Sequence, residues 1–168
     1  MKQKLFFSLA AASVLFLTSC GPTQNEAIEY NDKIVDIQKA LLPAQDGFIN
    51  QIDGHNKDSL KIAQANFSEK AKIALEACQK MTDFGGKREY LDASIDYFKG
   101  SLSLADNEAK QITLIMTKDS ADVTDKDVAD VKVYAGKFDS EYGKILQKVQ
   151  TAQAAFSKEW KFDVAAGK

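Results

Sequence analysis

Apolar residues recur along most of the chain at alternating spacings of three and four. The run with the most regular spacing lies between Leu91 and Met116. This spacing is typical of an amphipathic helix that buries one face, and Gly100 falls on the opposite side of that helix. The stripe consists of Leu91, Ile95, Phe98, Leu102, Ala105, Ala109, Ile112 and Met116.

The pattern predicts another long helix over about residues 25–53. Its apolar face is wide, because a second apolar row repeats every seven residues beside the first. Pro43 removes one backbone hydrogen bond, but the stripe keeps its phase, so we expect a kink there rather than a loop. The main stripe is Ala27, Tyr30, Ile34, Ile37, Leu41, Ala44, Phe48 and Ile52, and the second row is Ile28, Val35, Leu42 and Ile49.

Two further helices are bounded by capping and turn residues. One begins at Asp58 or Ser59 and is expected to end at the glycine pair 85–86. The other begins at Thr124, which can form a capping box with Asp127, and continues to Trp160. Their stripes are Leu60, Gln64, Phe67, Ala71, Ala74, Cys78 and Met81 in the former, and Val128, Val131, Ala135, Phe138, Tyr142, Ile145, Val149, Ala152 and Phe156 in the latter.

These four helices and their short links favour an all-α fold. We expect an up-down-up-down antiparallel four-helix bundle over residues 25–168. No stretch alternates with a period of two, so strands are not expected. The chain after residue 19 has 149 residues, which is enough for one domain with a hydrophobic core.

The first 21 residues have a different pattern. Two lysines, Lys2 and Lys4, precede an apolar run of 13 residues that ends at Leu17. As a helix this run would reach roughly 20 Å, which is short of a bilayer core about 30 Å thick. The pattern therefore predicts a secretory signal over residues 1–19 rather than a membrane-spanning helix.

The tetrapeptide Leu17-Thr18-Ser19-Cys20 resembles the lipobox of bacterial lipoproteins. The resemblance implies cleavage before Cys20, acylation of that cysteine, a lipidated tether over residues 20–24 and a place in the cell envelope. The alternative is an ordinary signal peptide with an incidental cysteine. Gly21 stands where an aspartate would resemble an inner-membrane retention signal, which favours the outer membrane.

Charge and composition exclude several partners and chemistries. The signal holds two of the 22 basic residues and none of the 24 acidic ones, so the mature chain has a formal charge of −4, which argues against binding nucleic acid. The single histidine, His55, falls in a turn, and no glutamate lies on a core stripe, so a di-iron site is not expected. No catalytic motif occurs. We therefore expect no metal, no cofactor and no enzymatic activity, and Cys78 should be a small buried hydrophobe.

Three features could still form surfaces. Ala129, Gly136 and Gly143 form a small-residue column at spacings of seven, which indicates either tight packing within the bundle or an interaction groove. Trp160 and Phe162 are expected to cap the bundle, with contact to the membrane interface as the alternative. Seven aspartates should gather at one end, either as helix-end charges or as a weak calcium site or a patch for a basic partner. They are Asp53, Asp58, Asp119, Asp122, Asp125, Asp127 and Asp130.

The mature chain also resembles small helical surface lipoproteins of Bacteroidetes and spirochaetes, a family of unknown function. The resemblance lies in residues 30–35 and 152–160 and implies a four-helix lipoprotein without assigning site residues. We expect an envelope lipoprotein that binds an envelope or extracellular protein partner. The alternative is a carrier of a small apolar ligand, which would need a cavity above about 300 Å³ between the helices.

Overall fold

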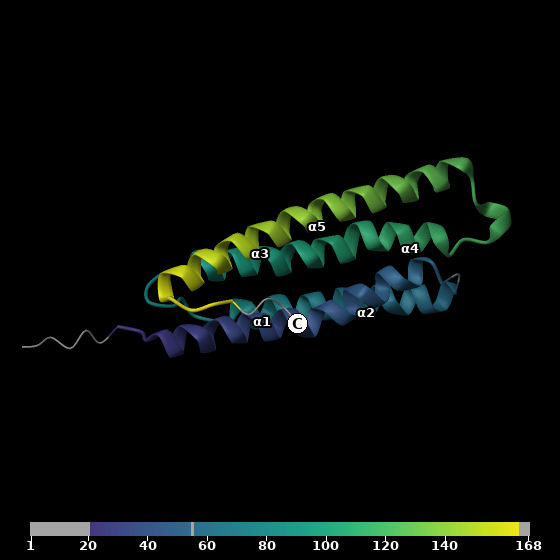
Figure 1. Ribbon diagram of the computed structural model, residues 1–168. Coiled ribbons are helices and arrows are strands. Elements are labelled where there is room, and N and C mark those ends of the chain that lie inside the picture. Colours follow the sequence, from purple (N-terminus) through teal and green to yellow (C-terminus); the bar gives the residue numbers. More distant parts are fainter. Residues whose placement is uncertain (1–20, 55, 165–168) are drawn as a thin grey trace, which may run out of the picture.

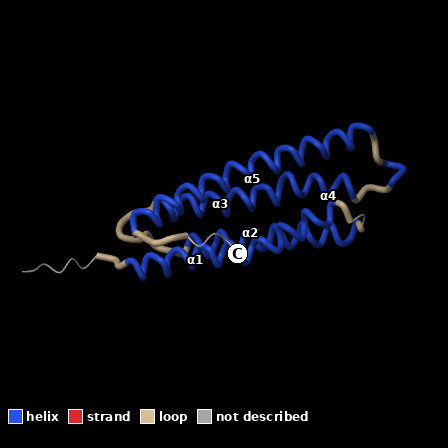
Figure 2. The backbone as a smooth tube through the Cα atoms, in the orientation of Figure 1, coloured by secondary structure: helices blue, strands red, loops and turns tan. Residues whose placement is uncertain are grey.

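A computed structural model describes residues 21–54 and 56–164, and its regular elements there are helices, with no strand (Figures 1 and 2). The all-α prediction is therefore confirmed for these residues. Residues 1–19, Cys20 and His55, for which we predicted a signal, a lipid anchor and a turn, lie outside them. In the described part of the chain, no helix combines the length and apolar character needed to cross a bilayer. The helices are α1 (Gln24–Ile52), α2 (Lys57–Gln79), α3 (Glu89–Leu104), α4 (Lys110–Met116) and α5 (Asp125–Trp160).

Helices that follow one another in the chain lie side by side. α1 packs on α2, α2 on α3, and α3 on α5, whereas α1 and α5 contact each other less closely. The pair formed by α1 and α2 diverges from the pair formed by α4 and α5 toward one end (Figure 1). We call that end, with residues 117–124, the distal end, and we call the end with residues 21–23, 80–88 and 161–164 the proximal end.

Side-chain caps fix where the helices begin. Thr23 and Glu26 form a capping box at α1, and Thr124 and Asp127 form the predicted one at α5. The Lys118 ammonium, together with hydrogen bonds from Thr124, holds the pKa of the Asp127 carboxyl well below its usual range. The start predicted for α2, at Asp58 or Ser59, is wrong by two or three residues, because Asn56 caps the helix and its side-chain oxygen accepts a hydrogen bond from the Ser59 amide at 2.9 Å.

The predicted end of α2 is also wrong. The helix ends at Gln79, and the glycine pair forms a separate two-residue turn at the proximal end. Gly85 and Gly86 have φ angles of +63° and +76°, which two-residue hairpin turns favour. The Phe84 amide donates to the Lys87 carbonyl at 3.2 Å, and the Lys87 amide donates back at 3.1 Å.

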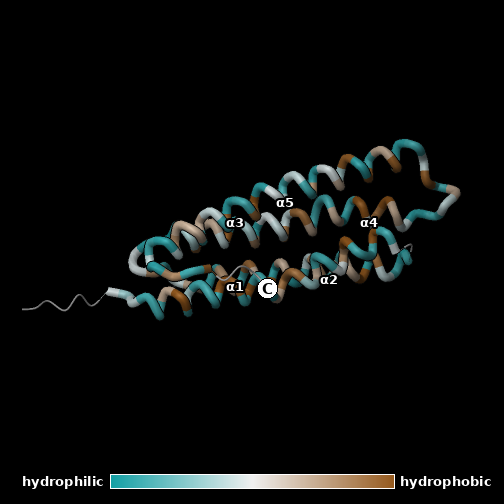
Figure 3. The backbone as a smooth tube through the Cα atoms, viewed as in Figure 1, coloured by the Kyte–Doolittle hydropathy of each residue, from teal (hydrophilic) through white to brown (hydrophobic). Residues whose placement is uncertain are grey.

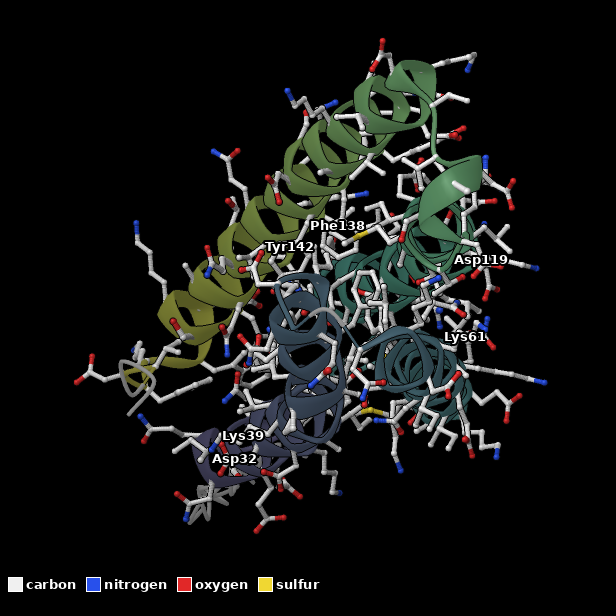
Figure 4. All side chains as sticks on the ribbon, turned by 90° about the vertical axis from the view of Figure 1, so that its right-hand side faces the viewer. Asp32, Lys39, Lys61, Asp119, Phe138 and Tyr142 are labelled. Atoms are coloured by element: carbon white, nitrogen blue, oxygen red, sulfur yellow. The ribbon has the colours of Figure 1, made fainter. Side chains whose placement is uncertain are left out.

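Apart from Val128, the apolar residues of the four main predicted stripes are buried or partly buried in the hydrophobic core. Ala105 and Phe138 are buried, while Leu102, Tyr142 and Ile145 are partly buried and pack against the buried residues. Figure 4 shows Phe138 and Tyr142 pointing inward, whereas Asp32, Lys39, Lys61 and Asp119 point outward. α1 continues through Pro43 as one helix, as the phase of its stripe predicts.

A π-helical segment, Ala105–Ala109, joins α3 to α4. The wider turn of a π-helix leaves a carbonyl free of its usual partner, and the Gln64 side-chain amide donates to the Ala105 carbonyl at 3.0 Å. This contact explains why a glutamine occupies the apolar stripe of α2. The spacing of the stripe predicts one long helix and gives no sign of the π segment.

Candidate interaction surface

The small-residue column lies on the outer side of α5. Ala129, Gly136 and Gly143 are all exposed. A β-carbon added to Gly136 or Gly143 would have no heavy atom within 4 Å beyond its own helix backbone and chain neighbours. No described residue therefore packs closely against these glycines, and the space in front of them is open.

A second row of side chains, on α1, is also left out of the core. The row of Ile28, Val35, Leu42 and Ile49 was expected to widen the buried face, yet the first three are only partly buried and Ile49 is 43% exposed. None of the four belongs to the core or packs against it. The expectation of a wide buried face on α1 is therefore wrong, because α5 packs too loosely on this side to cover it.

The row and the column lie on the same outer face. Asn31 of α1 accepts a hydrogen bond from Gln153 of α5 at 2.8 Å, which identifies the sides on which the two helices meet. At 100° per residue, the row on α1 and the column on α5 both lie outward from this line of contact. We call this surface the α1–α5 face. It consists of Ile28, Val35, Leu42, Ile49, Ala129, Gly136 and Gly143.

An apolar groove of about 270 Å³ lies at the distal end between α4 and the start of α5. Val128, which we predicted to lie in the core, lines the groove and is 51% exposed. That prediction is wrong because the start of α5 lies where the two helix pairs diverge (Figure 1). Figure 3 shows hydrophobic positions along α4 and near the start of α5. The groove is lined by Ile115, Met116, Val123, Asp127, Val128, Val131 and Lys132.

The volumes of the cavities are relevant to the alternative that the protein carries a small apolar ligand between its helices. A second cavity, at the proximal end, measures about 160 Å³ and is lined in part by Tyr30, Tyr90 and Phe156. Both volumes are below the roughly 300 Å³ at which small-molecule pockets usually begin. The larger one is bounded by α4, α5 and their link, so it lies beside the core rather than within it.

Lysines accompany the aspartates of the distal end. Lys118 Nζ lies 2.6 Å from Asp127 Oδ1, and Lys126 pairs with Asp130. Lys57 Nζ lies 3.1 Å from Asp119 Oδ1. Among the residues that the structure describes, no three His, Cys, Asp or Glu side chains gather as a metal site would require. Asp127 thus caps α5, and Asp58, Asp119, Asp127 and Asp130 each lie beside a lysine.

Cys78 lies on the core side of α2, as its place in the stripe predicts. Its side chain is fully buried and is not in a disulfide. Burial raises the pKa of the Cys78 thiol to about 11. The thiol is thus kept protonated near neutral pH, which disfavours the thiolate that nucleophilic chemistry requires.

The sequence analysis missed a row of polar residues in the seam between α1 and α5. Asn31 and Gln45 are buried, and Gln38, midway between them, is partly buried. The Asn31 side-chain oxygen accepts hydrogen bonds from Tyr90 at 3.1 Å and from Gln153 at 2.8 Å. In the sequence, this row is visible as amide side chains repeated every seven residues at positions 31, 38 and 45.

Exposed apolar and small residues thus lie on the α1–α5 face and at the distal end, and exposed isoleucines also occur on α2, where Ile62 is 70% and Ile73 is 50% exposed. Elsewhere on α5, the core stripe is covered by α3, and charged side chains such as Lys148 pair with neighbours such as Asp96. A comparison of this chain with protein-family models, curated proteins and solved structures found no match.

Proposed function

We propose that this chain is a lipid-anchored envelope protein that binds a helical segment of another envelope protein. In this proposal, the four long helices form an up-down-up-down antiparallel bundle, and Cys20 carries the lipid. The observation that carries the proposal is the distal groove, which is lined mainly by apolar residues and in which Val123 and Val128 are 42% and 51% exposed. Exposed apolar surface of this kind marks interaction sites on soluble domains.

A helix is the occupant that this surface favours. On the α1–α5 face, apolar side chains on α1 and small residues on α5 repeat every seven residues. A helix presents side chains with the same repeat, and helix-in-groove recognition uses such anchors. Glycines on one wall let another backbone approach closely, so Gly136 and Gly143 lie where a partner helix would gain most from their lack of a side chain.

The carrier alternative has less support. A small apolar ligand would need an enclosed cavity, and the volumes of about 160 Å³ and 270 Å³ are both small for one. The described core is instead filled by closely spaced rings, for example Phe48 and Phe67, whose centroids are 6.2 Å apart. We therefore place the binding surface on the outside of the helices.

Replacing Cys20 by alanine tests the anchor. We expect the Cys20→Ala variant to lose acylation and to accumulate as uncleaved precursor, because the lipobox cysteine supplies the sulfur that receives the lipid. Metabolic labelling with a fatty-acid analogue, followed by mass spectrometry of the N-terminal peptide, measures both effects. Equal labelling of the wild-type protein and the variant would refute the lipoprotein assignment.

Filling the glycine column tests the interaction surface. We expect Gly136→Leu combined with Gly143→Leu to keep the protein folded, because both positions face open space and leucine favours helix more than glycine does. The two leucines should block the approach of a partner helix and weaken its crosslinks to this protein on intact cells. Circular dichroism and crosslinking coupled to mass spectrometry measure the two effects.

The adjacent positions provide the control. Lys137→Leu combined with Lys144→Leu adds the same side chains with the same spacing on the same helix, turned by 100° away from the α1–α5 face. This control should retain the partner crosslinks. If the glycine variant folds and keeps every crosslink, the α1–α5 face is not the binding surface. If it unfolds, the column has a structural role.

A further inference from the structure

A group of apolar side chains closes the proximal end. The rings of Phe84 and Trp160 have centroids 5.0 Å apart in an edge-to-face arrangement. A β-carbon placed on Gly85 would lie 3.1 Å from Trp160 Cζ2 and 3.6 Å from Pro22 Cγ. Three separate parts of the chain therefore converge here. We call this group the proximal cluster, and it consists of Pro22, Phe84, Trp160 and Phe162.

The end of α5 is fixed within this cluster. Lys161 adopts a left-handed conformation with a φ angle of +59°, which ends the helix. The Phe162 amide then donates to the Ser157 carbonyl at 3.0 Å, and the Phe162 ring packs on Phe156 with centroids 6.0 Å apart. The Gln24 side-chain amide donates to the Lys161 carbonyl. The start of α1 and the end of α5 are thus joined directly.

The cluster caps the core, as predicted, but its outer side remains exposed. Trp160 and Phe162 are only partly buried, and Pro22 is exposed. An apolar group at the tip of a helical protein, partly packed and partly uncovered, has apolar surface with which a bilayer can make contact. Tryptophan in particular is favoured at the headgroup level of a bilayer, where its ring is both apolar and polar.

The length of chain beyond the described residues identifies what lies against the cluster. Only Gly21 separates Pro22 from Cys20, so the sulfur-bearing residue lies within about 7 Å of Pro22. The headgroup region on each side of a bilayer is also about 5–8 Å deep. Acyl chains on Cys20 that enter the hydrocarbon core would therefore bring the proximal cluster into the headgroup region.

We propose that the proximal cluster is a lipid-contacting surface, with Trp160 and Phe162 inserted at the headgroup level beside the lipid on Cys20. This inference rests on the proposed acylation of Cys20. It adds a second, protein-based contact that sets the orientation of the molecule on the membrane. The 36 residues of α5 then extend about 54 Å away from the bilayer, and this places the distal groove well above the lipid surface.

The single tryptophan of the chain makes the contact directly measurable. The full-length protein is purified in its acylated form, and mass spectrometry verifies the lipid on Cys20. It is then reconstituted into vesicles of phosphatidylethanolamine and phosphatidylglycerol, with or without lipids brominated near the headgroup end of the acyl chains. We expect the bromolipids to lower Trp160 fluorescence roughly twofold, because the ring lies at headgroup depth.

A variant with its tryptophan at the other end provides the control. Trp160→Phe combined with Val123→Trp, in the same acylated protein, moves the fluorophore to an exposed distal position, and its emission should be unchanged by the bromolipids. If the protein is acylated and Trp160 is not quenched, the lipid contact is refuted while the anchor stands. Quenching of both variants alike would refute the orientation. If Cys20 carries no lipid, the proposed anchor fails and the inference fails with it.

Discussion

Replacing Phe138 by alanine is expected to lower the free energy of unfolding by about 3–5 kcal/mol, as for other large-to-small changes in packed cores. Phe138 is 5% exposed and lies where α5 meets the other helices. Its ring centroid is 6.1 Å from that of Phe67 and 6.3 Å from that of Phe48. These neighbours belong to different helices, so no single rearrangement would close the resulting cavity.

Urea or guanidinium unfolding of the wild-type protein and the variant measures this loss. Val133→Ala is the control, because Val133 lies on the same helix and is 54% exposed. Its change should stay within about 0.5 kcal/mol. A loss below about 1 kcal/mol for Phe138→Ala would mean that α5 is not packed as the structure indicates.

The helices could be predicted because their signals are local. The capping box of Thr124 with Asp127 and the alternating stripe that follows it depend only on residues of α5, and both are confirmed. The glycine pair 85–86 is also a local signal, but the sequence analysis interprets it as the end of a helix, whereas it forms a hairpin turn. A left-handed glycine can end a helix or form a hairpin turn, and only the packing of Phe84 against Trp160 decides between them.

The relations between helices were harder to predict. Periodicity shows which side of a helix is apolar, but it does not show how much of that side a neighbour covers. Val128 belongs to the stripe of α5 and yet is exposed, whereas Asn31 is polar and yet is buried. Asn31 is buried because Tyr90 and Gln153 donate hydrogen bonds to its side-chain oxygen, whereas Val128 lies at the distal end, where the helix pairs diverge (Figure 1).

The candidate surface could be predicted only in part. The spacing of Gly136 and Gly143 indicated an unusual column and left open whether it faced inward or outward. The absence of any heavy atom near their missing β-carbons places the column on the outside. The sequence predicts that the row containing Ile28 and Ile49 lies in the core. Apolar residues at helical spacing give the same sequence pattern whether another helix or solvent lies opposite them.

At Gly100, the packing expected from the sequence differs clearly from the packing in the structure. This glycine was expected to lie away from any packing, yet a β-carbon there would meet Cδ1 and Cγ2 of Ile145 at 2.9 Å. The position is a close approach between α3 and α5. Cγ2 is attached to the branched β-carbon of Ile145, whose rotamers within a helix are restricted, so a simple rotation of the side chain does not relieve the contact.

Gly100→Ala and Gly136→Ala are therefore expected to change stability in opposite directions. Alanine gains roughly 1 kcal/mol over glycine within a helix, and Gly136, which faces open space, should show this gain in full. At Gly100 the gain is offset by overpacking, which typically costs about 1–3 kcal/mol, so the net result should be a loss of up to about 2 kcal/mol. Denaturant midpoints at an unchanged slope measure both variants. If Gly100→Ala stabilises the protein as much as Gly136→Ala does, α3 and α5 do not approach as closely as the structure shows.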